Sequence, residues 1–510
     1  MEDPAANASA RDPTFKCGFY LHTSWEFAYP LAVRSWSPED YRRFFALLQR
    51  LDFNLVMFWP LTEAMPAPLS AADCRELDAM RQLVDEAHAC GLEFWLTFCP
   101  NTTAQPEIAA QPFKQRHLYP FRVEVRLDHP RARADYLAHR ARLFRILNNA
   151  DAYVTIDGDP GGYPGAKPRQ FAEVLEADRV VLNRWGTHPE SQAVVPWLWA
   201  GWGADWAKQG VWGEPVEPLA GPFLEEMRHL PEPWTLLPGR HIREGRGNGR
   251  TMLELTERAG LTERSVLMCY EIVEFEPTPP AVVLQFDDIR RVLRQEAPLL
   301  AKAQGIMGNA QQPLLALPNL FLFARAARDP AWLERSDEEV LGELAQFLGG
   351  EANLLLPAWQ CLQLGLDALP ADLPARLEQA RLESASAQLL PGGPARYLQI
   401  LAAFVRARLG VLHACAAPAA PEVAAVAGLC RAVGALVAWW RVHRYVFTGE
   451  RGMDFQWEFT HPELLAPLQV WAKQLLPLSE DVVAGAARQL AAAGGLTEAE
   501  ASARLRELVA

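Results

Sequence analysis

Short apolar runs alternate with stretches of helical periodicity from residue 15 to about residue 329. This alternation is typical of strands and helices that wind around a parallel sheet. The run at residues 54–60 is continuously apolar after Asn54, as expected for a strand buried on both faces. Eight such runs predict an α/β fold, a (β/α)8 TIM barrel over residues 15–330, with strands at residues 15–23, 54–60, 92–99, 152–156, 180–182, 234–237, 265–272 and 305–308.

Helical segments between these runs carry start and stop signals. Ser37, followed by Pro38 and Glu39, has the residue types of a helix N-cap and first turn. Further helices are expected at residues 72–90 and 130–147, and Gly91 is placed to end the first of these. The Trp-rich segment at residues 196–212 fits neither the strand pattern nor the helix pattern.

Beyond residue 330 the chain becomes rich in Ala and Leu and loses strand signals. This change predicts an all-α C-terminal domain at residues 331–510. No flexible linker precedes that domain, so we expect it to pack on the barrel, and it is the candidate surface for a homodimer. Residues 1–14 are polar and Ala-rich, which predicts a disordered N-terminal tail.

Composition and charge narrow the class of function. The net charge is −13 and no basic stripe is present, so a nucleic-acid partner is not expected. The first residues lack a signal sequence, and the longest apolar stretch, residues 423–440, is interrupted by Arg431; we therefore expect a cytoplasmic protein without a membrane partner. The eight cysteines form no zinc or disulfide pattern, and no metal or organic cofactor is implied.

Candidate catalytic carboxylates follow the fourth predicted strand, at the end of the barrel where active sites lie. Asp157 and Asp159 stand two positions apart in the segment Asp-Gly-Asp-Pro-Gly-Gly. If strand geometry persists, both side chains point toward the barrel mouth. Two close carboxylates raise the pKa of one of them, which leaves a proton donor beside an ionised partner. The alternative is a turn whose carboxylates cap backbone amides.

A second carboxylate cluster follows the seventh predicted strand. Glu271 lies near the end of that strand and is the candidate nucleophile or charge stabiliser, with Glu274 and Glu276 as competitors. The alternative is an acidic segment that faces solvent. Asp287 and Asp288 precede a helix and are expected to supply its N-cap and its first-turn charge.

Aromatic and polar residues near the predicted strand ends favour a carbohydrate ligand. An indole face suits the C–H face of a pyranose, and polar neighbours suit its hydroxyl groups. The chain has 17 tryptophans, and those at or near strand ends or in barrel loops are Trp25, Trp59, Trp185, Trp202, Trp212 and Trp234. Tryptophan is also ordinary core material. The candidate substrate-binding residues, each of which could instead be structural, are His22, Trp59, Asn101, Asn183, Arg184, Trp185, His241, Glu274 and Asn309.

Three segments resemble the barrel domains of bacterial glycoside hydrolases related to the β-N-acetylhexosaminidases and α-glucuronidases of families 20, 67 and 84. They are residues 15–100, the loop from Asp157 to Gly162, and the segment Gly-Asn-Ala-Gln-Gln-Pro-Leu-Leu-Ala-Leu-Pro-Asn at residues 308–319. Families 20 and 84 carry two adjacent acids after the fourth strand, whereas Gly158 separates Asp157 from Asp159 here. That spacing is similar to the Asp-x-Glu pair of chitinase-like enzymes.

Together these features predict an exo-acting, retaining glycosidase, a hydrolase of O-glycosyl bonds that removes a terminal hexosamine or uronic acid. Asp159 is the expected general acid, Asp157 its partner, and Glu271 the nucleophile or charge stabiliser. The resemblance also allows substrate-assisted catalysis, in which Asp157 orients an acetamido group. Two other classes remain: a catalytically inactive carbohydrate-binding barrel, and a barrel lyase or isomerase, which would need a metal site or a basic residue that the sequence does not reveal.

Overall fold

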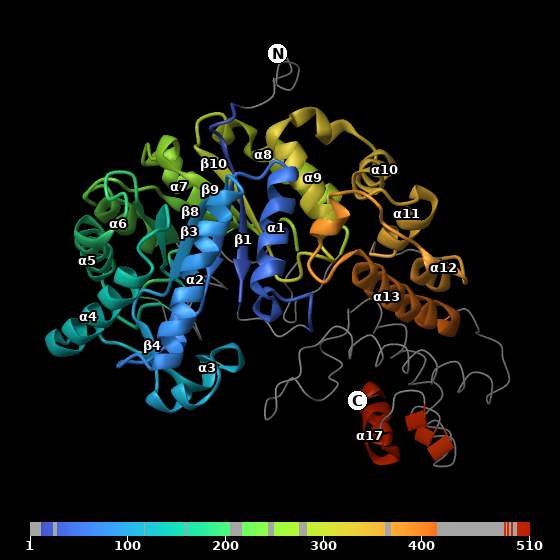
Figure 1. Ribbon diagram of the computed structural model, residues 1–510. Helices are drawn as coiled ribbons and strands as arrows, with labels where there is room; N and C mark the ends of the chain where they lie inside the picture. The colour runs from blue at the N-terminus through green and yellow to red at the C-terminus, as the bar shows by residue number, and fades with distance from the viewer. Residues whose placement is uncertain are drawn as a thin grey trace.

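Eight parallel strands close into a barrel in the computed structural model (Figure 1). The structure describes residues 12–23, 28–116, 118–158, 161–203, 217–242, 249–274, 283–362, 369–415, 484–485, 487–488, 491–492 and 497–509. Around the barrel the strands follow the order β1-β10-β9-β8-β7-β6-β3-β2. Their bounds are β1 Lys16–His22, β2 Leu55–Trp59, β3 Glu93–Phe98, β6 Ala152–Ile156, β7 Ala193–Leu198, β8 Leu237–His241, β9 Val266–Tyr270 and β10 Gly305–Ala310.

Helices follow the strands and surround the barrel (Figure 1). They are α1 Pro38–Arg50, α2 Ala71–Ala89, α4 Pro130–Ile146, α5 Pro168–Trp185, α6 Glu217–Met227, α7 Thr251–Arg258, α8 Phe286–Leu300 and α9 Leu317–Arg328. A small antiparallel sheet, β4 Thr102–Ala104 with β5 Arg122–Glu124, and the short helix α3 Leu118–Phe121 lie in the long connection between β3 and α4. The structure thus confirms the predicted (β/α)8 barrel.

Side chains that alternate between the two faces of each strand form two apolar cores, one inside the barrel and one outside it. Inward side chains such as Met57, Val154 and Met268 fill the barrel, whereas outward ones such as Phe58 and Tyr153 pack in a second cluster that includes the surrounding helices. Both faces of each strand are therefore buried, which is why most strands read as continuous apolar runs. This arrangement places the inward residues at the carboxyl ends of the strands around a common mouth.

The fifth and sixth strands differ from those predicted. Residues 180–182 belong to α5, where burial follows the helical period: Leu175 and Leu182 are buried, but Val180 is 67% exposed. The fifth barrel strand is β7, which runs into the start of the Trp-rich segment and in which Pro196 weakened the strand signal. The sixth strand, β8, begins only at Leu237, and Trp234 forms an isolated bridge before it.

Helix starts agree with the predicted signals at α1 but not at α8. Ser37 is the N-cap of α1 and accepts a 3.2 Å hydrogen bond from the amide of Asp40, as part of a capping box. In α8 the N-cap is Gln285, and Asp287 and Asp288 lie in the first turn, where their charges suit the helix dipole. The prediction of an Asp N-cap is therefore wrong.

Every element described beyond residue 330 is helical: the short 3-10 helices Pro330–Glu334 and Ala387–Leu389, and the α-helices α10 Asp337–Leu348, α11 Ala352–Gln360, α12 Leu373–Gln379, α13 Pro394–Cys415 and α17 Glu498–Val509. The helix α10 packs on α9, and the short helix at residues 387–389 packs on α1, whereas α11, α12 and α13 lie outside them (Figure 1). No helix within the described ranges has the length and hydrophobicity needed to cross a membrane.

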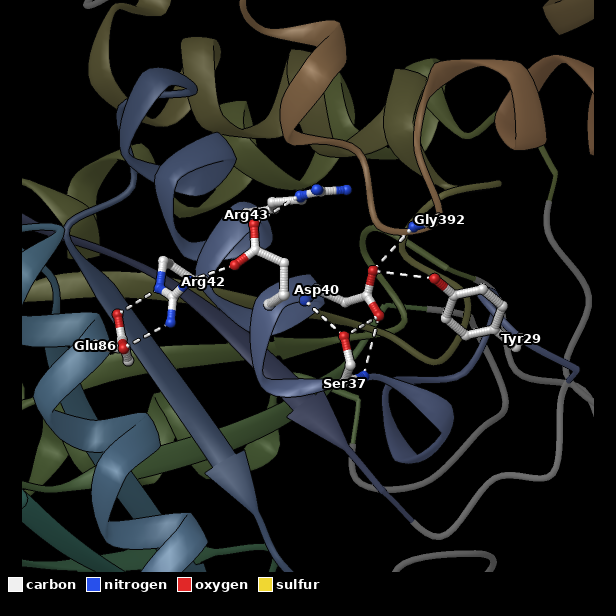
Figure 2. A network of polar contacts seen from close by, with 8 residues as sticks. Tyr29, Ser37, Asp40, Arg42, Arg43, Glu86 and Gly392 are labelled. Carbon is white, nitrogen blue, oxygen red and sulfur yellow. Dashed lines mark hydrogen bonds and ion pairs between the residues drawn. The ribbon is translucent and has the colours of Figure 1, made fainter.

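Polar contacts join α1 to the loop before α13 (Figure 2). The carboxylate of Asp40 accepts hydrogen bonds from the Gly392 amide at 3.0 Å and from the Tyr29 hydroxyl at 3.1 Å. At the other end of α1, Arg50 donates to the hydroxyl of Ser386 at 3.1 Å. These contacts, with the packing of residues 387–389 against α1, attach the described helical region to the barrel.

Candidate functional site

Aromatic and histidine side chains line one half of the barrel mouth. His22, the last residue of β1, lies edge-on to the ring of Trp59, the last residue of β2, with ring centroids 4.6 Å apart. Burial lowers the pKa of His22 to about 3, and the nearby charge of Arg34 acts in the same direction. The imidazole is therefore neutral over the physiological range and can act as a hydrogen-bond donor or acceptor.

A buried carboxylate holds this part of the mouth in place. The indole nitrogen of Trp59 donates to Glu63 Oε2 at 3.1 Å, and the amide of Cys99 donates to Glu63 Oε1 at 2.6 Å. Glu63 thus connects the end of β2 with the end of β3. Burial raises the pKa of Glu63, although these hydrogen bonds act in the opposite direction.

The other half of the mouth centres on Trp199, the residue after β7. Its ring lies 4.7 Å from that of His241, at the end of β8, and 5.6 Å from that of Tyr270, at the end of β9. Below this layer, Tyr20 of β1 meets Trp197 of β7 at 5.1 Å across the barrel. Amphipathic rings from both sides of the barrel therefore meet at its carboxyl end, where a ligand with C–H faces and hydroxyl groups would be recognised.

Asp157 follows β6 and is fully buried. Side chains along β6 alternate between the two faces of the strand, and those of Ala152, Val154 and Ile156 lie inside the barrel. Asp157 comes one position later and so belongs to the other face, and its carboxyl turns toward the loop after β7. There Oδ1 accepts a 2.7 Å hydrogen bond from the amide of Trp199. The other oxygen, Oδ2, is buried and has no hydrogen-bond partner among the described residues.

Burial raises the pKa of Asp157 to about 7, although hydrogen bonds from the amides of residues 199–201 act in the opposite direction. A carboxyl group with this pKa is partly protonated near neutral pH and can both donate and accept a proton. The contact with the amide of Trp199 is also what the turn-capping interpretation predicts. Asp159 and Glu276, the other carboxylates named near these loops, lie outside the described residues.

Glu271 follows β9, is fully buried and has a left-handed backbone, with φ of 69°. Its amide donates to Asn309 Oδ1 at 2.8 Å, and its carbonyl accepts from Gln285 Nε2 at 3.0 Å. A non-glycine residue in this conformation is strained unless its surroundings hold it. Asn309 comes from β10 and faces inward; its Nδ2 has no hydrogen-bond partner in the described part of the chain.

Glu274 and Asn101 are buried in contacts that use their side chains. Glu274 accepts hydrogen bonds from the amide and side chain of Gln312, at 2.6 and 3.1 Å, and burial raises its pKa to about 7. Asn101 accepts from the amide of Gly162 at 3.2 Å and donates to the carbonyl of Val125 at 3.0 Å. Asn101 therefore ties the loop after β3 to the loop that carries Asp157.

Three predicted substrate-binding residues, Asn183, Arg184 and Trp185, lie elsewhere. They are exposed in the last turn of α5, because the segment expected to be the fifth strand is helical. The side chain of Asn148, which precedes β6, donates to the carbonyl of Trp185 at 2.7 Å, which places this group at the amino end of the barrel. The prediction that they line the mouth is therefore wrong.

Trp199, Tyr270 and Glu63 were not singled out in the sequence, although the structure places them at the mouth. A signal for Trp199 was present: Trp197 and Trp199 are two positions apart, the spacing that puts both side chains on one face of a strand. Of the other tryptophans considered, Trp202 is buried and donates to the carbonyl of Lys167 at 2.7 Å, whereas Trp25 and Trp212 lie outside the described residues.

The sequence matches no protein-family model and no curated protein sequence. Its fold is similar to that of a mutant O-GlcNAc hydrolase from Thermobaculum terrenum, with 11% identity over 97% of this chain and 94% of that chain and a TM-score of 0.46. CpGH84D matches with 10% identity over 96% of this chain and 74% of that chain, and CpGH84B with 10% identity over 97% and 77%, each with a TM-score of 0.42.

Proposed function

We propose that the protein is a glycoside hydrolase whose substrate sugar binds at the carboxyl end of the barrel. The observation that carries this proposal is the link between Asp157 and Trp199. The buried carboxyl is bonded to the backbone of Trp199, and the ring of the same residue packs with His241 and Tyr270. An ionisable group of raised pKa thus adjoins a surface of amphipathic rings. A carboxyl group of raised pKa can serve as one of the two carboxyl groups of glycosidic cleavage, and the rings can bind the sugar.

In this proposal Asp159 protonates the glycosidic oxygen as the leaving group departs, and Glu271 attacks the anomeric carbon or stabilises its positive charge. Asp157 acts as the partner of Asp159; alternatively its carboxyl orients an acetamido group on the substrate. The neutral His22 and the indoles bind the sugar ring. The expected substrate is a terminal hexosamine or uronic acid, removed in exo fashion with retention of configuration.

Turnover of aryl glycosides by matched variants tests the proposal. Asp159→Asn should abolish hydrolysis of substrates with poor leaving groups and retain part of it with a nitrophenyl aglycone, because an activated leaving group needs less protonation. Asp157→Asn should lose activity on both substrates. If Asp157→Asn is instead the variant that an activated aglycone rescues, the two roles are exchanged.

A second candidate function is carbohydrate binding without catalysis. One contact favours this candidate. Asp157 Oδ1 already accepts a hydrogen bond from the amide of Trp199, which is the structural role that a carboxylate has when it caps a turn. A binding protein would retain sugar affinity in both Asp variants and show no turnover in the unmodified chain. Absence of hydrolysis with a panel of hexosaminides and uronides, together with measurable sugar binding, would replace the first proposal with this one.

A further inference from the structure

A cavity of about 260 Å³ lies on the flank of the barrel beside the ends of β1 and β2, where Thr23 and Pro60 in its wall directly follow His22 and Trp59. Its wall is mostly apolar and comes from the loop after β1, α1, α2, the end of β2 and the long loop after β3, with Trp36, Tyr41, Phe58, Met80, Leu83 and Phe113. Phe58 is an outward residue of β2, so it meets this cavity on the face of the strand opposite to the inward ring of Trp59. An apolar cavity of roughly 150 Å³ admits benzene, so this one has room for a ring with a short side chain.

One carboxylate in the wall has no partner. Glu76, on α2, is partly buried and forms no hydrogen bond or ion pair with any residue that the structure describes. Burial raises its pKa, although Lys114 and Arg116 act in the opposite direction. A carboxylate withdrawn from water without a compensating contact is unfavourable, and a ligand that donates to it would supply what the protein does not.

The cationic side chains in the same wall are already engaged. Arg116 donates to Asp73 at 2.6 Å and to the carbonyl of Ala64 at 2.9 Å, and Arg34 donates to the carbonyl of Arg116. Lys114, at the rim, donates to the carbonyl of Trp36 at 2.8 Å. Of the charged groups that line the cavity, Glu76 is therefore the one that forms no hydrogen bond or ion pair with a described residue.

We propose that this cavity is a second binding site, beside the candidate catalytic site but distinct from it, for a small molecule with an apolar body and one cationic amine. The body fills the space between Trp36, Phe58 and Met80, and the ammonium pairs with Glu76. Three probes that share one phenyl ring distinguish the chemistry: 2-phenylethylamine, the neutral 2-phenylethanol and the anionic phenylacetate.

Calorimetric titration of the full chain should show binding of the amine, with the alcohol on the order of tenfold weaker and the acid weaker still, because a hydrogen bond to a charged group contributes about tenfold in affinity. Glu76→Gln should reduce amine affinity by about the same factor and leave the affinity for the alcohol unchanged. Asp78→Asn is the matched control, since Asp78 is an exposed carboxylate on the same helix.

Ala79→Trp places an indole in the cavity and should abolish binding of all three probes, provided that its melting temperature stays close to that of the unmodified chain. Equal affinity for the amine and the acid, tighter binding of the acid, or unchanged amine affinity in Glu76→Gln would each overturn the proposal. These readouts measure binding alone, so they do not depend on whether the barrel hydrolyses glycosides.

Discussion

The side-chain oxygen of Asn309 accepts a 2.8 Å hydrogen bond from the amide of Glu271 and so joins the ends of two neighbouring strands. Because Glu271 has a positive φ, this contact helps to hold a conformation that the residue would otherwise leave. We expect Asn309→Ala to lower the free energy of unfolding by about 1–2 kcal/mol and to lower turnover by more than the stability loss explains. Urea unfolding and initial rates measure the two effects.

Asn149→Ala is the control for this variant. Asn149 precedes β6, at the amino end of the barrel, where it bonds to Asp85 at 2.7 Å and to the carbonyl of Arg81 at 3.1 Å. Its loss should lower stability without changing the turnover of the folded protein. Equal turnover in both variants would mean that Asn309 does not position Glu271.

The contribution of Asp157 to stability should fall as pH rises from about 4 to about 7. Burial raises the pKa of Asp157 to about 7, so between these values the folded protein holds a proton that the unfolded chain has released. The stabilisation is complete below the ordinary Asp pKa and is lost as pH rises through about 7. Asp157→Asn has no such proton, so over this range its melting temperature should fall less, or rise more, with pH than that of the unmodified chain.

Glu274 changes stability in the same direction, because burial also raises its pKa to about 7. Glu274→Gln should therefore change the slope of the same part of the pH profile in the same direction as Asp157→Asn, and the double variant should change it further. Melting curves at about pH 4 and about pH 7 measure the difference. A profile of the same slope in all three variants would contradict the assigned direction of both pKa values.

The continuous strands could be predicted from the sequence, but β7 could not. Residues 55–59 are apolar throughout, whereas Pro196 interrupts β7 and the Val-Val-Leu run at 180–182 belongs to a helix. Periodicity alone cannot separate a short buried strand from part of a helix. Two features of the site could not be predicted for another reason. Asp157 bonds to a backbone amide in the loop after β7, and Glu271 has a positive φ. Neither feature is determined by the residue types near it in the sequence.

Asp40 should prove important for attaching the helical region to the barrel. Its carboxylate caps α1 through Ser37 and also accepts hydrogen bonds from Gly392 and Tyr29 (Figure 2). Asp40→Ala should lower the free energy of unfolding by about 1–2 kcal/mol and speed proteolysis near residue 392. Glu39→Ala, which removes the neighbouring exposed acid, should leave the cleavage rate unchanged. Equal cleavage rates in the two variants would contradict the attachment role.

Hydrolysis should proceed with retention if Glu271 is the nucleophile. Proton NMR of the first-formed anomer, followed on substrates with and without a 2-acetamido group, measures this outcome. Retention on both substrates supports attack by Glu271, whereas retention that requires the acetamido group supports substrate assistance through Asp157. An inverted product would contradict both versions, and it would indicate a carboxylate that activates water instead.

Glu63 should act on substrate binding through Trp59. One carboxylate oxygen accepts from the indole of Trp59 and the other from the amide of Cys99, so two acceptors are needed. Gln offers one acceptor oxygen and a donor NH₂, and Glu63→Gln must therefore lose one of these bonds. We expect KM for the substrate to rise several-fold with a smaller change in kcat, because in the proposed site Trp59 binds the sugar and does not react.

A double-mutant cycle separates this positioning role from a general loss of stability. Trp59→Phe keeps an aromatic ring but removes the donor, so adding Glu63→Gln to it should raise KM by less than Glu63→Gln does in the unmodified chain. The melting temperature of each variant shows how much structure is lost. If the two changes in KM simply multiply, Glu63 does not act through Trp59. In that case its role is confined to the amide of Cys99, and ring packing of His22 with Trp59 and Tyr20 holds the aromatic wall at β1 and β2.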